Sequence, residues 1–292
     1  MDAVFWQFCL SGLSAGAIYA LIALGFGVVE NATGIVNFAQ GDFLVFGAFL
    51  ASSFLLSWHC PYWLTYPVVI FSTALLGLLL ERLVLARARS REILILVFIT
   101  VGASIFLRGI IKEIWGKRPL ALPPLFREDP FQLGGLVIDP QNLGILLVAL
   151  GAFFILHLFF HYTLWGKAMR AVAVDPETAA LMGIPVSRVV AASFALAGAL
   201  GGLAGMLIAP VSPLSFDSGV VIGLKGFAAA ILGGYGHFGG ALLGGLCLGL
   251  LEALSAYFVS SAYKNVLAFA VLVLVLLVRP EGILGRRRGE RL

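Results

Sequence analysis

The sequence predicts an all-α, polytopic membrane protein, and three observations lead to this fold class. Of its 292 residues, 61% are hydrophobic and only 12% are charged, and the mean hydropathy is +1.04. Apolar runs of about 20 residues, the length that crosses about 30 Å of hydrocarbon, recur along the chain. Glycines at small-xxx-small spacing, such as Gly198/Gly202 and Gly240/Gly244, let membrane helices approach closely. We therefore expect about eight or nine transmembrane helices in a single domain, residues 1–292.

The first apolar run spans Val4–Val29, and a polar segment follows it. No basic residue precedes the run, so we expect it to be retained rather than cleaved as a signal peptide. In the polar segment, Asn37, Gln40 and Asp42 stand directly before the next apolar stretch. Polar backbone at membrane depth is tolerated only where it is buried in protein or lines a water-filled path. The segment is therefore either a re-entrant part of a translocation path, lined by these three side chains, or an interfacial loop whose amides cap the next helix.

Basic residues orient the remaining helices. A third run spans Trp63–Leu85, and the arginines around its end predict a cytoplasmic loop: Arg82, Arg87, Arg89 and Arg91. Alternation then makes residues 112–141 an extracytoplasmic loop and residues 162–188 a cytoplasmic one. The last run, Val266–Val278, precedes a basic cytoplasmic tail, residues 279–292. The N-terminus lies outside with nine crossings and inside with eight, and the sequence leaves both open.

The other apolar runs cover residues 93–111, 142–160, 189–209 and 218–259. The last of these is broken at Gly233–Gly240, whose GxGxxG spacing lacks the preceding strand of a dinucleotide site. We interpret it as a glycine-rich turn between two closely packed helices. Interrupted segments in both halves of a chain are typical of transporters built from repeats. The breaks at Asn37–Asp42 and Gly233–Gly240 therefore indicate an internal duplication in which they correspond.

A short helix is predicted within the loop 162–188. Asp175 can cap a helix that starts at Pro176, Gly183 can end it in a left-handed conformation, and Pro185 prevents its continuation. A helix from Pro176 to Met182 has about two turns, whereas helices below about 12 residues are marginal alone in water. It therefore either docks against a partner or remains part of a solvated connector.

Two charged residues lie inside apolar runs, Lys225 and Glu252. Such charges are expensive in a membrane, and we expect these two to pair across neighbouring helices as a structural contact. A proton or substrate site is the alternative, but no chain of further carboxylates accompanies them. Arg108 is expected near a helix end, where its side chain can reach water. The four histidines and three cysteines are scattered without metal-ligand spacing, so no metal site is predicted.

With these features together, the chain resembles the permease subunits of branched-chain amino-acid ABC importers, the LivH-like family. Five ordered segments carry the resemblance over nearly the whole length: GLSAGAIYALIALGFGVV, ATGIVNFAQGDFLVFGAFLA, TLWGKAMRAVAVDPETAALMGIPVSRV, LKGFAAAILGGYGHFGGALLGGLCLGLLEAL and RPEGILG. The resemblance implies a type II-like importer permease with broken or re-entrant segments, in the bacterial inner membrane.

The resemblance also implies partners and a coupling site. The expected partners are a second, LivM-like permease, two cytoplasmic ATPases and an extracytoplasmic solute-binding protein. The loop 162–188 resembles the coupling loop that docks on an ATPase, and its matching and apolar positions are Gly166, Lys167, Arg170, Glu177, Ala180, Leu181, Met182 and Gly183. The chain has no GxxxxGK[ST] phosphate loop, so ATP and magnesium are expected on the ATPases, and no cofactor on this chain.

Three other functions remain to be distinguished. The same machinery imports urea, amides or aromatic acids in some relatives, and the resemblance does not select among these substrates. A stand-alone channel or secondary transporter would work without ATP. An integral-membrane enzyme would need clustered catalytic side chains, which the sequence does not supply, so we expect a non-catalytic transport subunit that contacts lipid and no nucleic acid.

Overall fold

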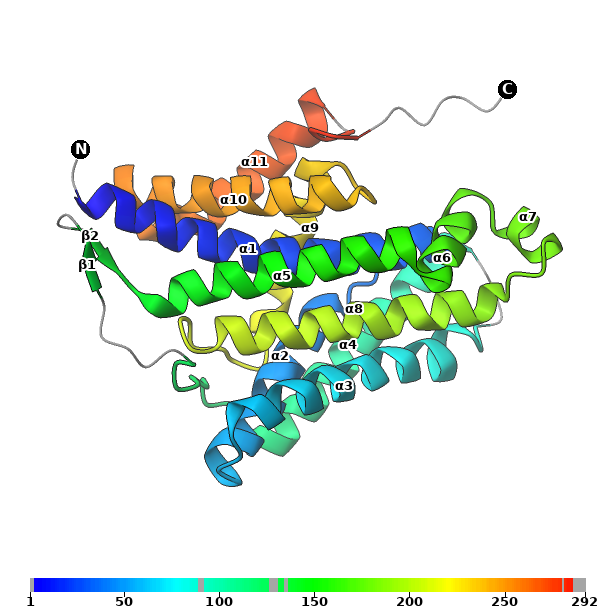
Figure 1. The fold of residues 1–292 in the computed structure, drawn as a ribbon, viewed down its shortest axis with the longest axis horizontal. Helices are drawn as coiled ribbons and strands as arrows, with labels where there is room; N and C mark the ends of the chain where they lie inside the picture. The colour runs from blue at the N-terminus through cyan, green and yellow to red at the C-terminus, as the bar shows by residue number, and fades with distance from the viewer. Residues whose placement is uncertain (1–2, 89–91, 126–130, 134–135, 280, 286–292) are drawn as a thin grey trace.

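The computed structural model describes residues 3–88, 92–125, 131–133, 136–279 and 281–285 (Figure 1). The predicted all-α class is confirmed, with one short antiparallel hairpin added, in which Gln132 pairs with Val137. The elements are α1 (Ala3–Thr33), α2 (Gln40–Ser52), α3 (Tyr62–Leu80), α4 (Ile93–Trp115), β1 (Phe131–Leu133), β2 (Leu136–Ile138), α5 (Pro140–Tyr162), α6 (Leu164–Val174), α7 (Pro176–Leu181), α8 (Val186–Ile208), α9 (Ser218–Gly233), α10 (Phe238–Phe258) and α11 (Lys264–Val278).

Within the described residues, seven helices are long and apolar enough to cross a membrane: α1, α2, α3, α4, α5, α8 and α10. Two of them include a π-helical turn at the end, Ser53–Ser57 after α2 and Glu81–Leu85 after α3. Helices α9 and α11 are apolar but shorter. The expected count of eight or nine crossings therefore stays a prediction. Figure 1 shows the N-terminus and the β-hairpin at one end of the molecule, and α6 and α7 at the opposite end.

Helix α1 forms the centre of the bundle. In its 18-residue apolar stretch 89% of the residues are buried, because α5, α8, α9 and α10 surround the helix. A helix that is apolar on all sides is stable only when neighbours cover every face, and α1 meets that condition. In the 18-residue apolar stretch of α4 only 17% of the residues are buried, so α4 lies at the edge of the bundle. The side chains of α4 are therefore expected to face lipid or another chain.

Two four-helix units, α1–α4 and α8–α11, make up most of the bundle, and their first helices, α1 and α8, run in opposite directions (Figure 1). Helix α1 packs along α10, and α3 packs along α8 in the equivalent way. Glycines make both contacts close: Gly12 lies against Gly249 in the first pair, and Gly198 lies against Thr73 in the second. These paired contacts are the ones that an inverted repeat would produce, so they support the internal duplication predicted from the sequence.

The proposed correspondence between the two breaks was wrong. In each unit a long helix is followed by a returning segment and then by a helix that starts inside the bundle, α2 in one unit and α9 in the other. The counterpart of the break before α2 is therefore residues 209–217, before α9. Gly233–Gly240 is the turn between α9 and α10, as its glycines predicted, with φ of 106° at Gly234 and 80° at Gly236.

The segment before α2 is re-entrant rather than interfacial. Gln40 is fully buried, and its Nε2 donates to the Ala197 carbonyl oxygen in the middle of α8 at 3.0 Å. Gln40 also packs on Gly25, which precedes the end of α1 at Thr33 by eight residues, or about 12 Å along the helix. Of the described side chains none caps α2, and Asn37 Oδ1 accepts a hydrogen bond from the Ala39 N–H instead.

The start of the predicted basic tail packs back onto the bundle. The backbone N–H groups of Ile283 and Leu284 donate to the carbonyl oxygens of Leu232 and Gly233, at 2.8 and 3.0 Å. These bonds take up carbonyl groups at the end of α9 that the helix itself leaves unpaired. Four arginines predicted for the cytoplasmic tail lie outside the described residues: Arg286, Arg287, Arg288 and Arg291. Arg89, Arg91 and part of the loop 112–141 lie outside them as well.

Candidate functional site

The predicted short helix is present as α7, with the predicted caps. Asp175 Oδ1 accepts hydrogen bonds from the backbone N–H groups of Glu177 at 3.0 Å and Thr178 at 3.3 Å. At the other end Gly183 has φ of 84°, and the Ile184 N–H returns to the Ala179 carbonyl oxygen at 3.0 Å. The glycine is in the left-handed conformation, and the hydrogen bond joins an N–H group to the carbonyl oxygen five residues earlier. This arrangement, the Schellman motif, satisfies the last carbonyl groups of the helix. Hydrogen bonds between residues only a few positions apart therefore define both ends of α7.

A second helix in the loop, α6, was not predicted. Thr163 caps it by accepting the Gly166 N–H at 3.0 Å, and Met169 and Val172 bury its inner face against the bundle. Gly166 is buried against the end of α5, and it packs so closely there that a side chain would overlap the backbone of Phe160. The signal that sequence reasoning missed is the Thr163 cap followed by apolar residues at helical spacing. Helix α6 anchors the segment that carries α7.

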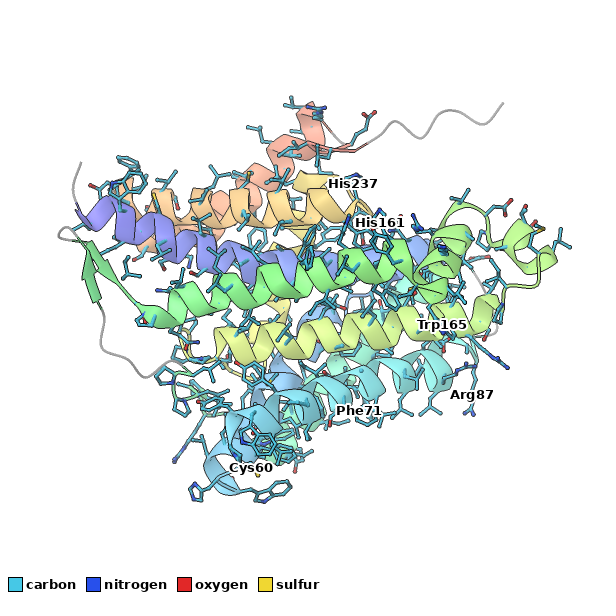
Figure 2. The ribbon with its side chains drawn as sticks, in the orientation of Figure 1. Cys60, Phe71, Arg87, His161, Trp165 and His237 are labelled. Atoms are coloured by element: carbon cyan, nitrogen blue, oxygen red, sulfur yellow. The ribbon has the colours of Figure 1, made fainter. Side chains whose placement is uncertain are left out.

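Most of the candidate coupling residues face outward. Gly166 is buried, while the other seven are exposed: Lys167, Arg170, Glu177, Ala180, Leu181, Met182 and Gly183. Leu181 is 88% exposed and Met182 is 79% exposed. Helix α7 projects beyond the ends of the neighbouring helices, and Trp165 lies at the same end of the molecule as Arg87 (Figure 2). The projecting helix therefore presents apolar side chains together with positive and negative charges.

The three candidate path residues are buried inside the bundle. Asn37 and Gln40 are fully buried, and Asp42 is 1% exposed. Asn37 and Gln40 stabilise the segment between α1 and α2 through the hydrogen bonds described above. Gln40 thereby packs between α1, α2 and α8. Asp42 has a charged partner, since its Oδ1 lies 3.6 Å from Arg108 Nε on α4.

Arg108 was expected near a helix end, and that expectation was wrong. It lies two turns before the end of α4, and its Nη2 donates to Ser104 Oγ at 3.3 Å. Its side chain is 26% exposed and borders a cavity of about 140 Å³ between α1, α4 and α9. An arginine within an apolar run was the available signal. Its pairing with Asp42 required knowledge of how α2 and α4 pack.

Lys225 and Glu252 form the ion pair that their positions predicted. Lys225 Nζ lies against Glu252 Oε1, and Tyr19 Oη donates to Glu252 Oε2 at 2.7 Å. Lys264 Nζ at the start of α11 is 3.8 Å from the same carboxylate. The group therefore links α1, α9, α10 and α11 through one buried carboxylate. Each charge has a partner of opposite sign, as a buried charge requires.

One tyrosine in the turn between α9 and α10 has a shifted pKa. Burial raises the pKa of the Tyr235 hydroxyl well above its ordinary value, and the nearby Glu30 carboxylate raises it further. Asn31 Nδ2 fixes the same turn by donating to the Gly236 carbonyl oxygen at 2.8 Å. The turn is therefore tied to the end of α1 by polar contacts. Among the described residues, no group of three or more histidine, cysteine, aspartate or glutamate side chains has the geometry of a metal site.

Comparisons with known proteins agree with this architecture. The family described as "Branched-chain amino acid transport system / permease component" matches residues 8–276. The high-affinity branched-chain amino acid transport system permease protein LivH of Escherichia coli K12 is 34% identical, over 98% of this chain and 97% of its own. The corresponding permease BraD of Pseudomonas aeruginosa is also 34% identical, over 98% of both chains.

A solved structure, PsaBC from Streptococcus pneumoniae in complex with Fab, is similar in fold. It covers 95% of this chain and 92% of its own at 14% sequence identity, with a TM-score of 0.51. This likeness concerns the arrangement of helices alone.

Proposed function

The chain belongs to the family of branched-chain amino acid transport permease components, and we propose that it moves branched-chain or related amino acids into the cell by alternating access. It is a multi-pass inner-membrane protein and the permease component of an importer. As a transport permease it acts together with the other components of an ABC system. The identity of its substrate and of each partner forms the proposal.

Helix α7 is the observation that carries the proposal. It is capped at both ends and projects from the bundle, and both its last residue, Leu181, and the following Met182 are largely exposed. An amphipathic helix with exposed apolar anchors is suited to a groove on another protein. The positive-inside rule assigns this end of the molecule to the cytoplasm, because Arg87 lies there too. A cytoplasmic ATPase is therefore the proposed partner of α7, with Lys167, Arg170 and Glu177 as charged contacts.

The remaining partners follow from the same proposal. A second permease of the LivM-like type completes the path, a second ATPase docks on it, and a solute-binding protein delivers the amino acid from outside. ATP and magnesium bind to the ATPases, and this chain takes no part in their hydrolysis. Closure of the ATPases pushes on α6 and α7, and the two inverted units switch between two packings. Asn37, Gln40 and Asp42 hold the returning segment beside that path.

Reconstitution of the complete complex in liposomes tests the proposal. We expect ATP-dependent uptake of labelled leucine, isoleucine or valine when the binding protein is present outside. Uptake of urea, amides or aromatic acids in their place would change the substrate and keep the importer. Uptake by this chain alone, without ATP or partners, would instead identify a channel or a secondary transporter and reject the proposal.

A further inference from the structure

The cavity between α1, α4 and α9 combines an apolar wall with a charged one. Three phenylalanine rings form the apolar wall: the Phe227 centroid is 5.6 Å from that of Phe26 and 6.3 Å from that of Phe38. Ser104 and Arg108 of α4 form the polar side. A cavity of about 150 Å³ takes up benzene in another protein, so a volume of about 140 Å³ admits a small organic molecule.

Arg108 is held in place and still has donors to offer. Ser104 and Asp42 engage its Nη2 and Nε atoms, which fixes the plane of the guanidinium group. A guanidinium group has five N–H donors, and of the residues that the structure describes none accepts a hydrogen bond from Nη1. A fixed guanidinium fork with unused donors matches a carboxylate group, which it binds through two parallel hydrogen bonds.

Asp42 supplies the opposite charge at the same place. Its Oδ1 is buried and has no hydrogen-bond partner in the described part of the chain. Gly219 lines the cavity, and a Cβ atom on it would lie only 3.0 Å from this oxygen. Asp42 therefore lies directly behind the Gly219 backbone, which lines the cavity. The Arg108 guanidinium at 3.6 Å partly compensates this buried charge, and an ammonium group in the cavity would compensate it further.

We infer that this cavity is an intramembrane binding site for the zwitterion of an apolar amino acid in transit. Arg108 receives the α-carboxylate, and the negative charge of Asp42, behind Gly219, attracts the α-ammonium group. The rings of Phe26, Phe38 and Phe227 contact the aliphatic side chain. The inference rests on the proposed function, because it defines where the proposed substrate binds within this chain.

Uptake by the complete complex in liposomes, with saturating binding protein, provides the first test. Arg108→Gln should lower the rate of leucine uptake by about tenfold or more, because a bidentate charged contact is lost. The affinity of the binding protein for leucine should stay unchanged. Lys112→Gln is the matched control, since Lys112 lies one turn further along α4 and outside the cavity wall. It should transport at the rate of the unaltered complex.

Two further measurements separate binding from folding. Val220→Phe fills the cavity and leaves the Arg108–Asp42 pair intact, so it should lower uptake while the complex still assembles and hydrolyses ATP. Alkylation of Val101→Cys, in a background without the three native cysteines, should be slowed by leucine and not by leucinamide, which lacks the carboxylate. This readout does not depend on transport.

The outcomes distinguish the site from the proposed function. Normal uptake by both Arg108→Gln and Val220→Phe, or equal alkylation with and without leucine, overturns the binding site while the importer remains. Failure of the unaltered complex to import any amino acid with ATP rejects the proposed function, and the inferred site with it.

Discussion

Gly41 of α2 and Gly219 of α9 lie backbone against backbone where the two inverted units meet. A Cβ atom on Gly219 would come within 2.7 Å of the Gly41 carbonyl oxygen, and a Cβ atom on Gly41 would overlap the Gly219 carbonyl oxygen. Each glycine is the second residue of its helix. The contact therefore joins the starts of the two helices that begin inside the bundle, and no larger residue fits at either position.

Gly41→Ala should destabilise the protein by about 1–3 kcal/mol, because the added methyl group forces two packed backbones apart. The midpoint of thermal unfolding of the purified protein in detergent measures this effect. Gly102→Ala on α4 is the control, since no described atom lies within 4 Å of the added Cβ. There the midpoint should stay or rise slightly, because alanine favours a helix. An equal shift for both variants would contradict the close contact.

Lys225→Met should also lower the unfolding midpoint, because it leaves the Glu252 carboxylate as a buried charge without its nearest partner. Breaking a buried pair typically costs about 3–5 kcal/mol. The double variant Lys225→Met/Glu252→Gln should recover much of the loss, since no unpaired charge remains. Lys264→Met is the control, because the Lys264 side chain is 43% exposed and its contact with Glu252 is screened by solvent. A midpoint unchanged by Lys225→Met would contradict the structural role of the pair.

Gly183→Leu should uncouple ATP hydrolysis from transport while the permease still inserts and folds. Gly183 has φ of 84°, where a leucine costs about 1–2 kcal/mol, so the end of α7 changes shape. Uptake per ATP hydrolysed by the reconstituted complex is the measurement. Gly183→Asn is the matched control, since asparagine tolerates the left-handed conformation and should retain most of the coupling. Normal uptake by Gly183→Leu would count strongly against the coupling role of α7.

Leu181→Asp should weaken the binding of the ATPase to the permease in nanodiscs. Burying a leucine side chain contributes about 1.5–3 kcal/mol, so its loss corresponds to roughly ten- to hundredfold in the dissociation constant. Leu181 is 88% exposed, so the stability of the permease itself should not change. Leu181→Met conserves the apolar contact and should bind normally. Unchanged ATPase binding by Leu181→Asp would place the docking surface elsewhere.

Features that depend on neighbours in the chain were predictable from the sequence. The caps of α7 were found because Asp175 and Gly183 act on backbone groups only a few residues away. Membrane insertion follows from composition, and the ends of the long apolar helices were found within a few residues because polar residues or prolines stand there. Helix α6 was missed because its cap, Thr163, follows the apolar run of α5 without a visible break.

Contacts between distant segments were harder to predict. The sequence indicated a duplication, but it paired the break before α2 with Gly233–Gly240, since glycine-rich turns and returning segments look alike in sequence. Arg108 was expected near a helix end, and its pairing with Asp42 was not predicted. Lys225 and Glu252 were paired correctly because they lie on consecutive helices, where antiparallel packing brings such positions together.

The sequence by itself determined that this protein is a membrane-embedded helical bundle with a capped helix between α5 and α8, because hydropathy and capping are properties of consecutive residues. Its resemblance to a known family then implied the role of a permease. Only the tertiary structure decided that α2 and α9 begin inside the bundle and that Gly41 meets Gly219 there. It also decided that Asp42 pairs with Arg108, which borders a cavity. These relations depend on how helices far apart in the chain pack, and close packing is set by the shapes of both surfaces together.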